Sequence, residues 1–461
     1  MKYNKLILLN FLYYNNIYIQ IMAQNYLNSI RYKSNEIHLM NTHENYKFEK
    51  LGNYLVPSYQ RVNMCDLVSE ASIAPQTSLP SNAFTGSVYV DFEIPRSVNV
   101  LKSCVLSMQI DNGGTKPLVM PPISQLINRI EYYSGATLIE TILSTHLYLE
   151  SVMETTEKLT ILESSNNIDP VTFDHSPNLS NLGLFDPHGG LNCIISPNAS
   201  KTYYLKLNGV LNSTHLFIPG LKSEIRIRVY FESYGKWGLG LAEYTKLASV
   251  TTGLPTIESE IPTAPTMRKI EMRLQQIELA QHNYNKLMAT YRDKTPLCLR
   301  WLDRRYQTIS MQSSDGVTVN NVLSAINGMF SHFFIVLRKQ NAKGIDNYVF
   351  LPIDELWFAN ASGSNLHGGI QYQDKYLRGY YVDQNLERST VFTKKRIYPI
   401  LFCQDYYSTY NQCVNTGTMY FSASEQLYIK PGVTDTVELG VYGYALSTIV
   451  IRNGLIEIAK S

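Results

Sequence analysis

Apolar and polar side chains alternate along much of the chain from Phe84 onward, which is the period-two pattern of strands with one buried face. Between Val88 and Ile94 every second residue is Val, Phe or Ile, with Tyr, Asp and Glu between them. The segment Ile225–Phe231 alternates in the same way. Residues 101–110 form another expected strand, closed by an Asp-Asn-Gly-Gly turn. The pattern therefore predicts an all-β chain of short antiparallel strands.

Helical periodicity is confined to connecting segments. Leu147–Leu162 loses the two-residue period and carries Leu and Glu at helical spacing, and a long Asn/Ser/Pro/Gly-rich segment follows it. A second helical stretch, Gln373–Leu386, follows a Gly/Ser/His-rich segment in the other half of the chain. The sequence therefore predicts short helices within long loops.

The order of elements repeats in the two halves of the chain. The second half begins with expected strands at Leu299–Met311, Met329–Arg338 and Tyr348–Ala359. Its segment Ile353-Asp-Glu-Leu-Trp-Phe corresponds to the segment Ile127-Asn-Arg-Ile-Glu-Tyr-Tyr in the first half. In both halves a long loop and a helix follow this third strand. Such a repeat predicts a duplicated β-domain.

This duplication predicts the domain limits, and 461 residues are enough for two domains. We expect an N-terminal arm over 1–80, a first β-domain over 81–285 and a second over 286–461. Within the first of these ranges, residues 22–80 are polar and irregular, and residues 282–294 are expected to be a linker between the domains. Residues 1–21 are expected to be an upstream extension or an arm, because Met22 opens a plausible start and the apolar run before it is short for a signal peptide.

The last 65 positions carry the most specific pattern. Residues 397–461 are expected to form four closely spaced strands, the last of which ends in Ile-Val-Ile-Arg-Asn-Gly. This order resembles the final strands of the double jelly-roll major capsid proteins of virophages, polinton-like elements and nucleocytoplasmic large DNA viruses. Ile130-Glu131 and Gly135 also resemble a strand and turn of that family. Ala136 departs from its second Gly, and the loop at 413–417 departs from its usual Gln-Pro-Ser-Gly form.

The resemblance implies two tandem eight-stranded antiparallel jelly rolls and a structural role. Three chains would form a pseudo-hexagonal capsomer, as in hexons, of an icosahedral double-stranded DNA virus shell. The implied partners are copies of the same chain, neighbouring capsomers, and penton and minor capsid proteins, and the implied location is the virion, assembled inside the host cell. Loops at 163–200, 234–266 and 360–390 would form its outer towers, and the arm would face inward or reach a neighbour.

Composition fits this role. The chain has 40 basic and 38 acidic residues and a formal net charge of +2, so no strong field attracts nucleic acid and direct binding to it is not expected. Charged residues make up 17%, below the roughly 25% typical of soluble proteins, which favours a surface that packs against other copies.

Candidate chemistry is sparse, and we expect no catalytic, metal or cofactor site. The six cysteines include no Cys-x-x-Cys pair and are expected to be reduced and mostly buried. None of the nine histidines starts a His-x-His or His-x-Asp/Glu pair of the kind that metal-dependent jelly-roll enzymes use. His332, on an aromatic strand, is expected to be a packed core or interface residue, whereas His188 and His367 precede Gly-Gly pairs and are expected in turns.

Two basic segments also have ordinary structural interpretations. Arg226 and Arg228 alternate with apolar residues and are expected on a solvated strand face, while 394–396 (Lys-Lys-Arg) are expected to protect a strand edge. Two other functions stay open at this stage. The first is a glycan-binding or spike-like β-sandwich, which saccharide binding by a monomer would support. The second is a two-barrel metalloenzyme, which would require a bound transition metal.

Overall fold

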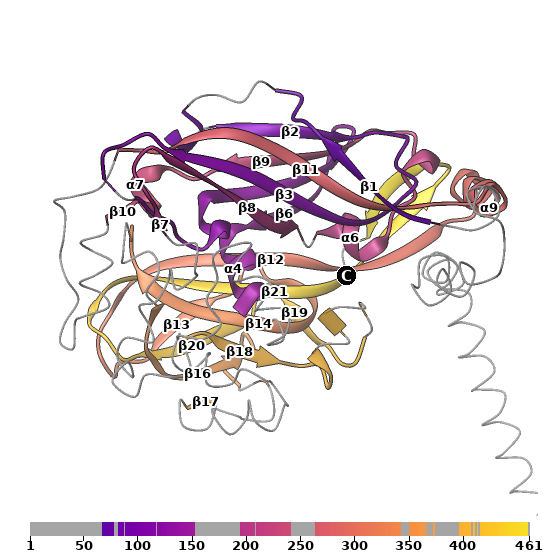
Figure 1. Cartoon of the computed structure of the whole chain (residues 1–461). Helices are drawn as coiled ribbons and strands as arrows, with labels where there is room; N and C mark the ends of the chain where they lie inside the picture. The colour runs from indigo at the N-terminus through magenta and orange to yellow at the C-terminus, as the bar shows by residue number, and fades with distance from the viewer. Residues whose placement is uncertain are drawn as a thin grey trace, which may run out of the picture.

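The computed structural model consists of two antiparallel β-barrels, one stacked on the other (Figure 1). The structure describes residues 67–77, 82–86, 88–116, 118–152, 194–207, 209–240, 263–342, 350–364, 366, 372–373, 396–406, 409–410, 413 and 415–459. Most of the predicted helix at 373–386 and most of the predicted tower loops lie outside these ranges, and residue 373 belongs to a strand.

The first barrel consists of two four-stranded sheets, with strand orders β1-β11-β3-β8 and β2-β9-β5-β6. The strands of the first sheet are β1 (Leu67–Ile73), β11 (Thr266–Glu278), β3 (Val100–Asn112) and β8 (Ala199–Leu207). Those of the second sheet are β2 (Tyr89–Ile94), β9 (Ile225–Phe231), β5 (Ile127–Ser134) and β6 (Thr137–Leu143).

The second barrel has the same strand order. One sheet runs β12-β21-β14 with β18 paired to β14, and the other runs β13-β20-β16-β17. Their bounds are β12 (Leu297–Ser313), β21 (Asp435–Arg452), β14 (Asn327–Lys339), β18 (Tyr398–Leu401), β13 (Val319–Val322), β20 (Gln426–Pro431), β16 (Ile353–Ala359) and β17 (Tyr372–Gln373). Each strand thus has its counterpart in the first barrel, which confirms the prediction of two tandem eight-stranded jelly rolls.

Short elements complete the chain. The additional strands are β4 (Leu118–Val119), β7 (Ile194–Ile195), β10 (Leu239–Gly240), β15 (Phe350–Leu351), β19 (Met419–Ser422) and β22 (Leu455–Ala459). The helices are α4 (Ser144–Val152), α6 (Val210–Thr214), α7 (Tyr234–Trp237) and α9 (Gln281–Arg292), with 3-10 turns η1 (Ala83–Thr85), η2 (Ile123–Leu126) and η4 (Ile218–Gly220).

The alternation of apolar and polar residues along the strands gives each barrel a hydrophobic core. Every odd residue of β9 from Ile225 to Phe231 is buried and the residues between them are partly exposed, as the sequence pattern predicts. One core lies within the first barrel and contains Trp237 and Phe92, and the other lies within the second barrel and contains Phe333 and Phe358. Each barrel therefore buries its own apolar strand faces.

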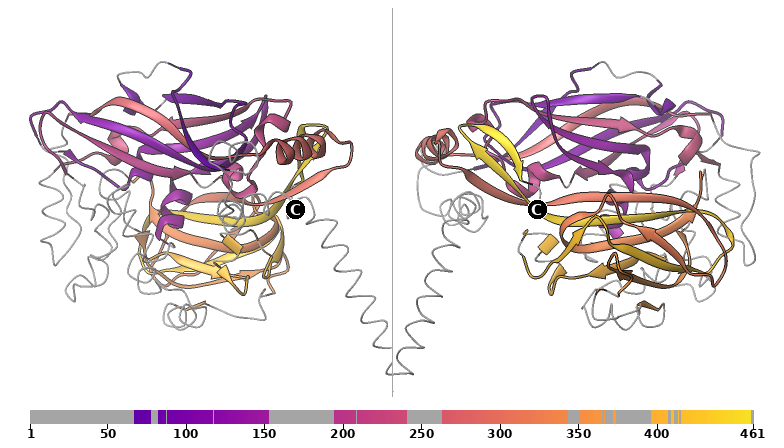
Figure 2. Two further views of the ribbon diagram at one scale, coloured as in Figure 1. Left: turned by 45° about the vertical axis from the view of Figure 1, so that its right-hand side comes forward. Right: turned by 180° about the vertical axis from the view of Figure 1, so that it is seen from behind.

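A two-stranded ribbon crosses from one core to the other. Strands β12 and β21 are paired over their whole length, from Leu297–Ile451 to Ser313–Asp435. The Leu297 and Ile451 end belongs to the core of the first barrel, whereas Val437 and Leu439 at the other end belong to the second. In both views of Figure 2 the yellow C-terminal hairpin of β21 and β22 rises along the side of the first barrel.

Three local predictions from the sequence were wrong. Residues 67–73, assigned to an irregular arm, form β1 and pair with β11. Residues 282–294, assigned to a linker, lie mostly in α9, which buries Leu287 and Tyr291. The described part of residues 397–461 contains five strands instead of four, because β22 follows the Asn453-Gly454 turn. The domain limits at 80/81 and 285/286 stay predictions.

Replacing Gly443 by alanine is expected to destabilise the second barrel by about 1–3 kcal/mol. A Cβ atom at this position of β21 would lie 2.5 Å from the Phe333 ring and 2.6 Å from the Phe330 ring, and both rings are buried. Urea unfolding checks the loss. Gly113→Ala is the matched control, because no atom lies within 4 Å of its added Cβ; equal stabilities of the two variants would contradict the prediction.

Candidate functional site at the junction of the two barrels

Helix α4 leaves the first barrel after β6 and enters the space between the barrels (Figure 1). Its residues Tyr148 and Leu149 are buried in the core of the second barrel, and Leu147 is buried in the core of the first. One short helix thus supplies side chains to both cores, so it fastens the barrels together.

A buried ion cluster lies beside this helix. The Arg304 guanidinium on β12 donates to the Glu140 carboxylate on β6 at 2.8 Å, and to both oxygens of Glu150 on α4 at 2.5 and 3.1 Å. The Val210 backbone N–H donates to Glu140 at 2.7 Å, and the Tyr410 hydroxyl donates to Glu150 at 2.9 Å. The cluster therefore links the last strand before α4, α4 itself and the first strand of the second barrel.

The three charged side chains are almost completely withdrawn from water. The side-chain exposure is 5% for Arg304, 0% for Glu140 and 2% for Glu150. Burial raises the pKa of Glu140 to about 7, although attraction to Arg304 opposes this shift. Burial also disfavours the Arg304 cation, but the Glu150 and Glu140 carboxylates outweigh it and raise the pKa of Arg304. We call Arg304, Glu140 and Glu150 the latch, because one buried cation is hydrogen-bonded to carboxylates from two other elements.

Two buried histidines flank the cluster. The His332 ring is stacked on Tyr444 at 4.3 Å between centroids, and the His146 ring meets the same tyrosine edge-on at 5.8 Å. Burial, together with the nearby Arg304 cation, lowers the pKa of both histidines to about 3. Both rings are thus neutral at neutral pH. The predicted burial of His332 is confirmed.

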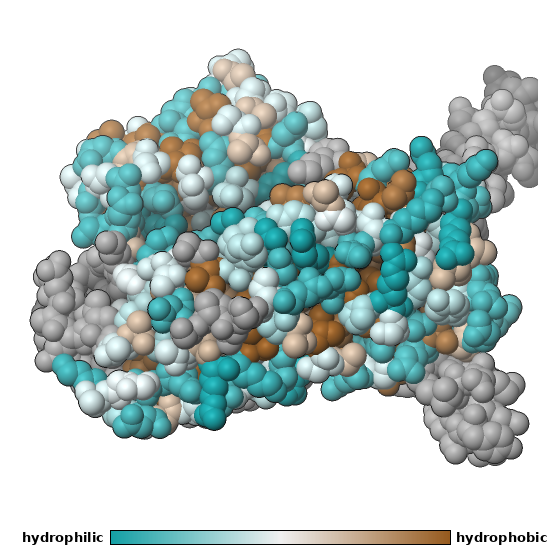
Figure 3. All heavy atoms as spheres, turned by 90° about the horizontal axis from the view of Figure 1, so that it is seen from above, coloured by the Kyte–Doolittle hydropathy of each residue, from teal (hydrophilic) through white to brown (hydrophobic). Residues whose placement is uncertain are grey.

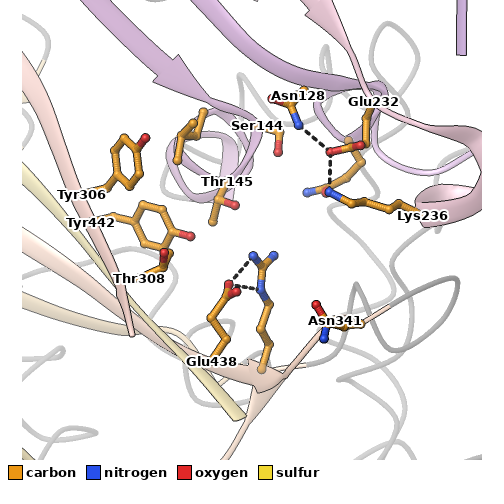
Figure 4. A pocket seen from close by; sticks show the side chains of 14 residues that line it. Asn128, Ser144, Thr145, Glu232, Lys236, Tyr306, Thr308, Asn341, Glu438 and Tyr442 are labelled. Atoms are coloured by element: carbon orange, nitrogen blue, oxygen red, sulfur yellow. Dashed lines mark hydrogen bonds and ion pairs between the residues drawn. The ribbon is translucent and has the colours of Figure 1, made fainter. Parts of the chain in front are cut away.

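A polar cavity of about 330 Å³ opens next to the latch, between the barrels (Figure 4). From the first barrel, Glu232 pairs with Lys236 at 3.2 Å and accepts from Asn128 at 2.8 Å. From the second barrel, Arg338 pairs with Glu438. Each cation in the lining thus has a carboxylate beside it, and the cavity carries no excess charge.

The outer face of the β2-β9-β5-β6 sheet is built from arginine and tyrosine. The Arg228 guanidinium donates to both Asp91 oxygens, at 2.7 and 2.9 Å, and lies 4.3 Å from the centre of the Tyr89 ring. Arg226 lies over Tyr133 at 5.1 Å. The expected solvated face is therefore only partly correct: these arginines point outward but are half-buried in a fixed array of rings and carboxylates.

The corresponding face of the second barrel carries another aromatic pair. Trp357 on β16 and Tyr428 on β20 stack with a centroid distance of 5.1 Å and an angle of 6°. One of these two sheets belongs to the first barrel and the other to the second (Figure 1). Viewed from above the first barrel, small apolar patches alternate with polar side chains (Figure 3).

Within the described ranges, the other sequence candidates bring no reactive site together. Cys104, Cys403 and Cys413 are buried, and burial raises the pKa of the Cys104 thiol. Across the ranges that the structure describes, no three His, Cys, Asp or Glu side chains gather as metal ligands, and no helix is long and apolar enough to span a bilayer. Positions 188, 367 and 394–395 lie outside the described residues.

The sequence analysis missed the latch itself. Its signal was a charged residue inside a strand with apolar residues nearby. Glu140 follows Ile139 and precedes Ile142 by two positions. Arg304 comes two positions after Leu302, although Asp303 and Arg305 adjoin it. Charged residues are almost never fully buried unless they are paired. Their partners, however, lie 154 and 164 positions away along the chain, too far for local patterns to identify.

Comparisons of the sequence and of the structure with known proteins give different results. The sequence matches no protein-family model and no curated protein. The structure is similar to the capsid chain of the PBCV-1 virus, with 12% identity and a TM-score of 0.55 over 89% of this chain and 100% of that one. It is also similar to the Faustovirus major capsid protein, with 12% identity and a TM-score of 0.55 over 94% and 99% of the two chains.

A third similar structure comes from the Sputnik virophage, with 11% identity and a TM-score of 0.51 over 86% of this chain and 88% of that one. At such low identity the likeness concerns the fold, and it agrees with the identical strand order of the two barrels. The chain has the double jelly-roll fold that these viral capsid proteins share.

Proposed function

We propose that the chain is the major capsid protein of a double-stranded DNA virus or virus-like element, a structural subunit without catalytic activity. The observation that carries this proposal is the pair of stacked jelly rolls of equal strand order in one chain, aligned with the whole length of the PBCV-1 capsid chain. The proposed location is the virion, with assembly inside the host cell.

The proposed unit is a homotrimer whose six barrels approximate a hexagon. Three copies joined head to tail through identical heterologous contacts close into a ring. The outer faces described above are suitable contacts, because each barrel carries one of them and together they present Tyr, Trp and Arg, residues that are enriched at protein interfaces. Penton, minor capsid proteins and neighbouring trimers are the further partners that this role requires.

The latch supports the same role. A trimer with six equivalent positions needs both barrels of each chain to keep a fixed relative orientation. Helix α4 and the Arg304 cluster hold the two barrels together through side chains from both.

Light scattering after size exclusion tests the proposal on the full chain and on a chain that starts at Met22. We expect one stable species at three times the monomer mass, with a pseudo-hexagonal outline in negative-stain images. A monomer at all concentrations would contradict the trimer. Saccharide binding by that monomer would favour the glycan-binding alternative.

A further inference from the structure

Four turns meet at one end of the first barrel, beside helix α9. They are 95–98 between β2 and β3, 219–223 before β9, 292–296 between α9 and β12, and 452–455 between β21 and β22. The Lys222 backbone N–H donates to the Gly454 carbonyl at 2.8 Å, and the Asn453 N–H donates to the Asp293 carbonyl at 3.0 Å. In both views of Figure 2 the coil of α9 and the yellow C-terminal hairpin lie side by side. These contacts place the turns on one surface.

This surface carries a local excess of positive charge. The four turns hold five basic residues and one acidic residue, Asp293; the basic residues are Arg96, Lys222, Arg292, Lys294 and Arg452, which we call the basic end. All five are exposed. The Arg96 guanidinium donates to the backbone carbonyls of Leu221 and Lys222, at 3.2 and 2.7 Å, so it ties two of the turns together without losing its charge.

The cations of the basic end have no neutralising neighbour in the described part of the chain. None of the five takes part in an ion pair between described residues. By contrast, Arg228 pairs with Asp91 on the outer face of the first barrel, and Arg338 pairs with Glu438 at the junction. Because the whole chain has a net charge of only +2, five cations against one carboxylate on one end make the charge distribution strongly asymmetric.

An apolar side chain is exposed on the same surface. Leu455 follows Gly454 in the turn between β21 and β22 and is 47% exposed. Its neighbours Ile456 and Ile458 pack against the core of the first barrel, so the hairpin that carries Leu455 is held in place. An exposed leucine among basic residues is suited to a lipid surface, because the cations attract anionic headgroups and the apolar side chain enters the boundary of the acyl chains.

We infer that the basic end binds a membrane surface that contains anionic lipids. Barrels that pack side by side cover one another's sides and leave their ends accessible, and this is the one point in which the inference rests on the proposed capsid role. Nucleic acid offers the same phosphate charge, and cations alone are enough to bind its backbone. An exposed leucine gains burial in a membrane but not on a phosphate backbone, so Leu455 favours the lipid surface.

Flotation of the full chain with lipid vesicles tests the inference. We expect binding to vesicles of equal parts phosphatidylserine and phosphatidylcholine, and none to vesicles of phosphatidylcholine alone. High salt should release the protein, because it screens the attraction. The double variant Lys222→Gln/Lys294→Gln should bind about 30-fold more weakly, since each basic residue near an anionic membrane contributes about fivefold. Both side chains are exposed, so the melting temperature should change little.

The matched control is Lys201→Gln/Arg268→Gln, which removes the same charge from the opposite end of the first barrel. Lys201 on β8 and Met267 on β11 both pair with Ile110, at the far end of β3 from the turn 95–98. This control should bind vesicles as the wild type does. Leu455→Ser should weaken vesicle binding about tenfold and leave its salt dependence unchanged, because it removes only the apolar contribution.

The inference is overturned if the wild type binds neither kind of vesicle, if it binds both equally, or if the two double variants lose the same affinity. Binding to double-stranded DNA that Lys222→Gln/Lys294→Gln weakens and Leu455→Ser does not, in the absence of vesicle binding, would assign the basic end to nucleic acid instead. The mass of the particle is measured separately and tests the trimer, so the two proposals fail independently.

Discussion

Replacing Arg304 by leucine is expected to lower the free energy of unfolding by about 3–5 kcal/mol. The substitution leaves the Glu140 and Glu150 carboxylates buried without their shared cation. Removing one partner of a buried ion cluster costs more than the cluster contributes, because the remaining charge has lost its water. Urea unfolding monitored by tryptophan fluorescence measures the change.

The control for this prediction is Arg273→Leu, which removes an arginine that is 50% exposed and pairs with Glu271 on the surface. Its expected effect is within about 1 kcal/mol. The triple variant that adds Glu140→Gln and Glu150→Gln should recover part of the Arg304→Leu loss, since it removes the stranded charges. A loss below about 1 kcal/mol for Arg304→Leu would refute the latch.

The fold is also expected to lose about 4 kcal/mol of stability between pH 7 and pH 5. Burial lowers the pKa of His146 and His332 to about 3 and that of His215 to about 4, from an ordinary value near 6.5. A lowered pKa stabilises the folded state above pH 6.5, and this contribution is lost as the pH falls toward the folded value. Each histidine accounts for about 2 kcal/mol over this interval.

Glu140 acts in the opposite direction. Burial raises its pKa to about 7, so its stabilising contribution is fully present below about pH 4.5 and is lost as the pH rises through 7. Acidification from pH 7 to pH 5 therefore increases the Glu140 contribution to stability by about 2 kcal/mol, which offsets the loss from one of the three histidines.

Urea unfolding at both pH values measures the net change. His332→Phe should reduce the difference by about 2 kcal/mol, because phenylalanine cannot take up a proton in the unfolded chain. His282→Phe, on the exposed side of α9, is the control and should leave the difference unchanged. Equal stability at pH 7 and pH 5 in the wild type would show that the buried histidines do not govern acid stability.

Much of the fold could be predicted from local patterns. The hydrophobic pattern located β2, β9 and β14 closely. Apolar residues occupy every second position of β2 and β9, whereas β14 buries a long, mostly apolar run. Strand β1 was missed because its inward side combines the small residues Ser69 and Ala71 with Ile73, too weak a signal beside the polar arm. Helix α9 was missed because its burial depends on two residues, Leu287 and Tyr291, one turn apart.

The junction could not be predicted in the same way. Glu140, Glu150 and Arg304 meet only after both barrels have formed, and nothing in the spacing of residues specifies that α4 enters the second core. The burial of His332 could be predicted from its aromatic neighbours, whereas its stacking on Tyr444 depends on the register of β14 with β21.

The ribbon of β12 and β21 has a consequence for the timing of synthesis. Ile449 and Ile451, close to the C-terminus, fill the core of the barrel whose other strands were made first. A ribosome that still holds residues 449–451 therefore carries a first barrel that lacks part of its interior. The first barrel can reach its final packing only after these residues have left the ribosome, so the two barrels mature together although most of one is translated long before the other.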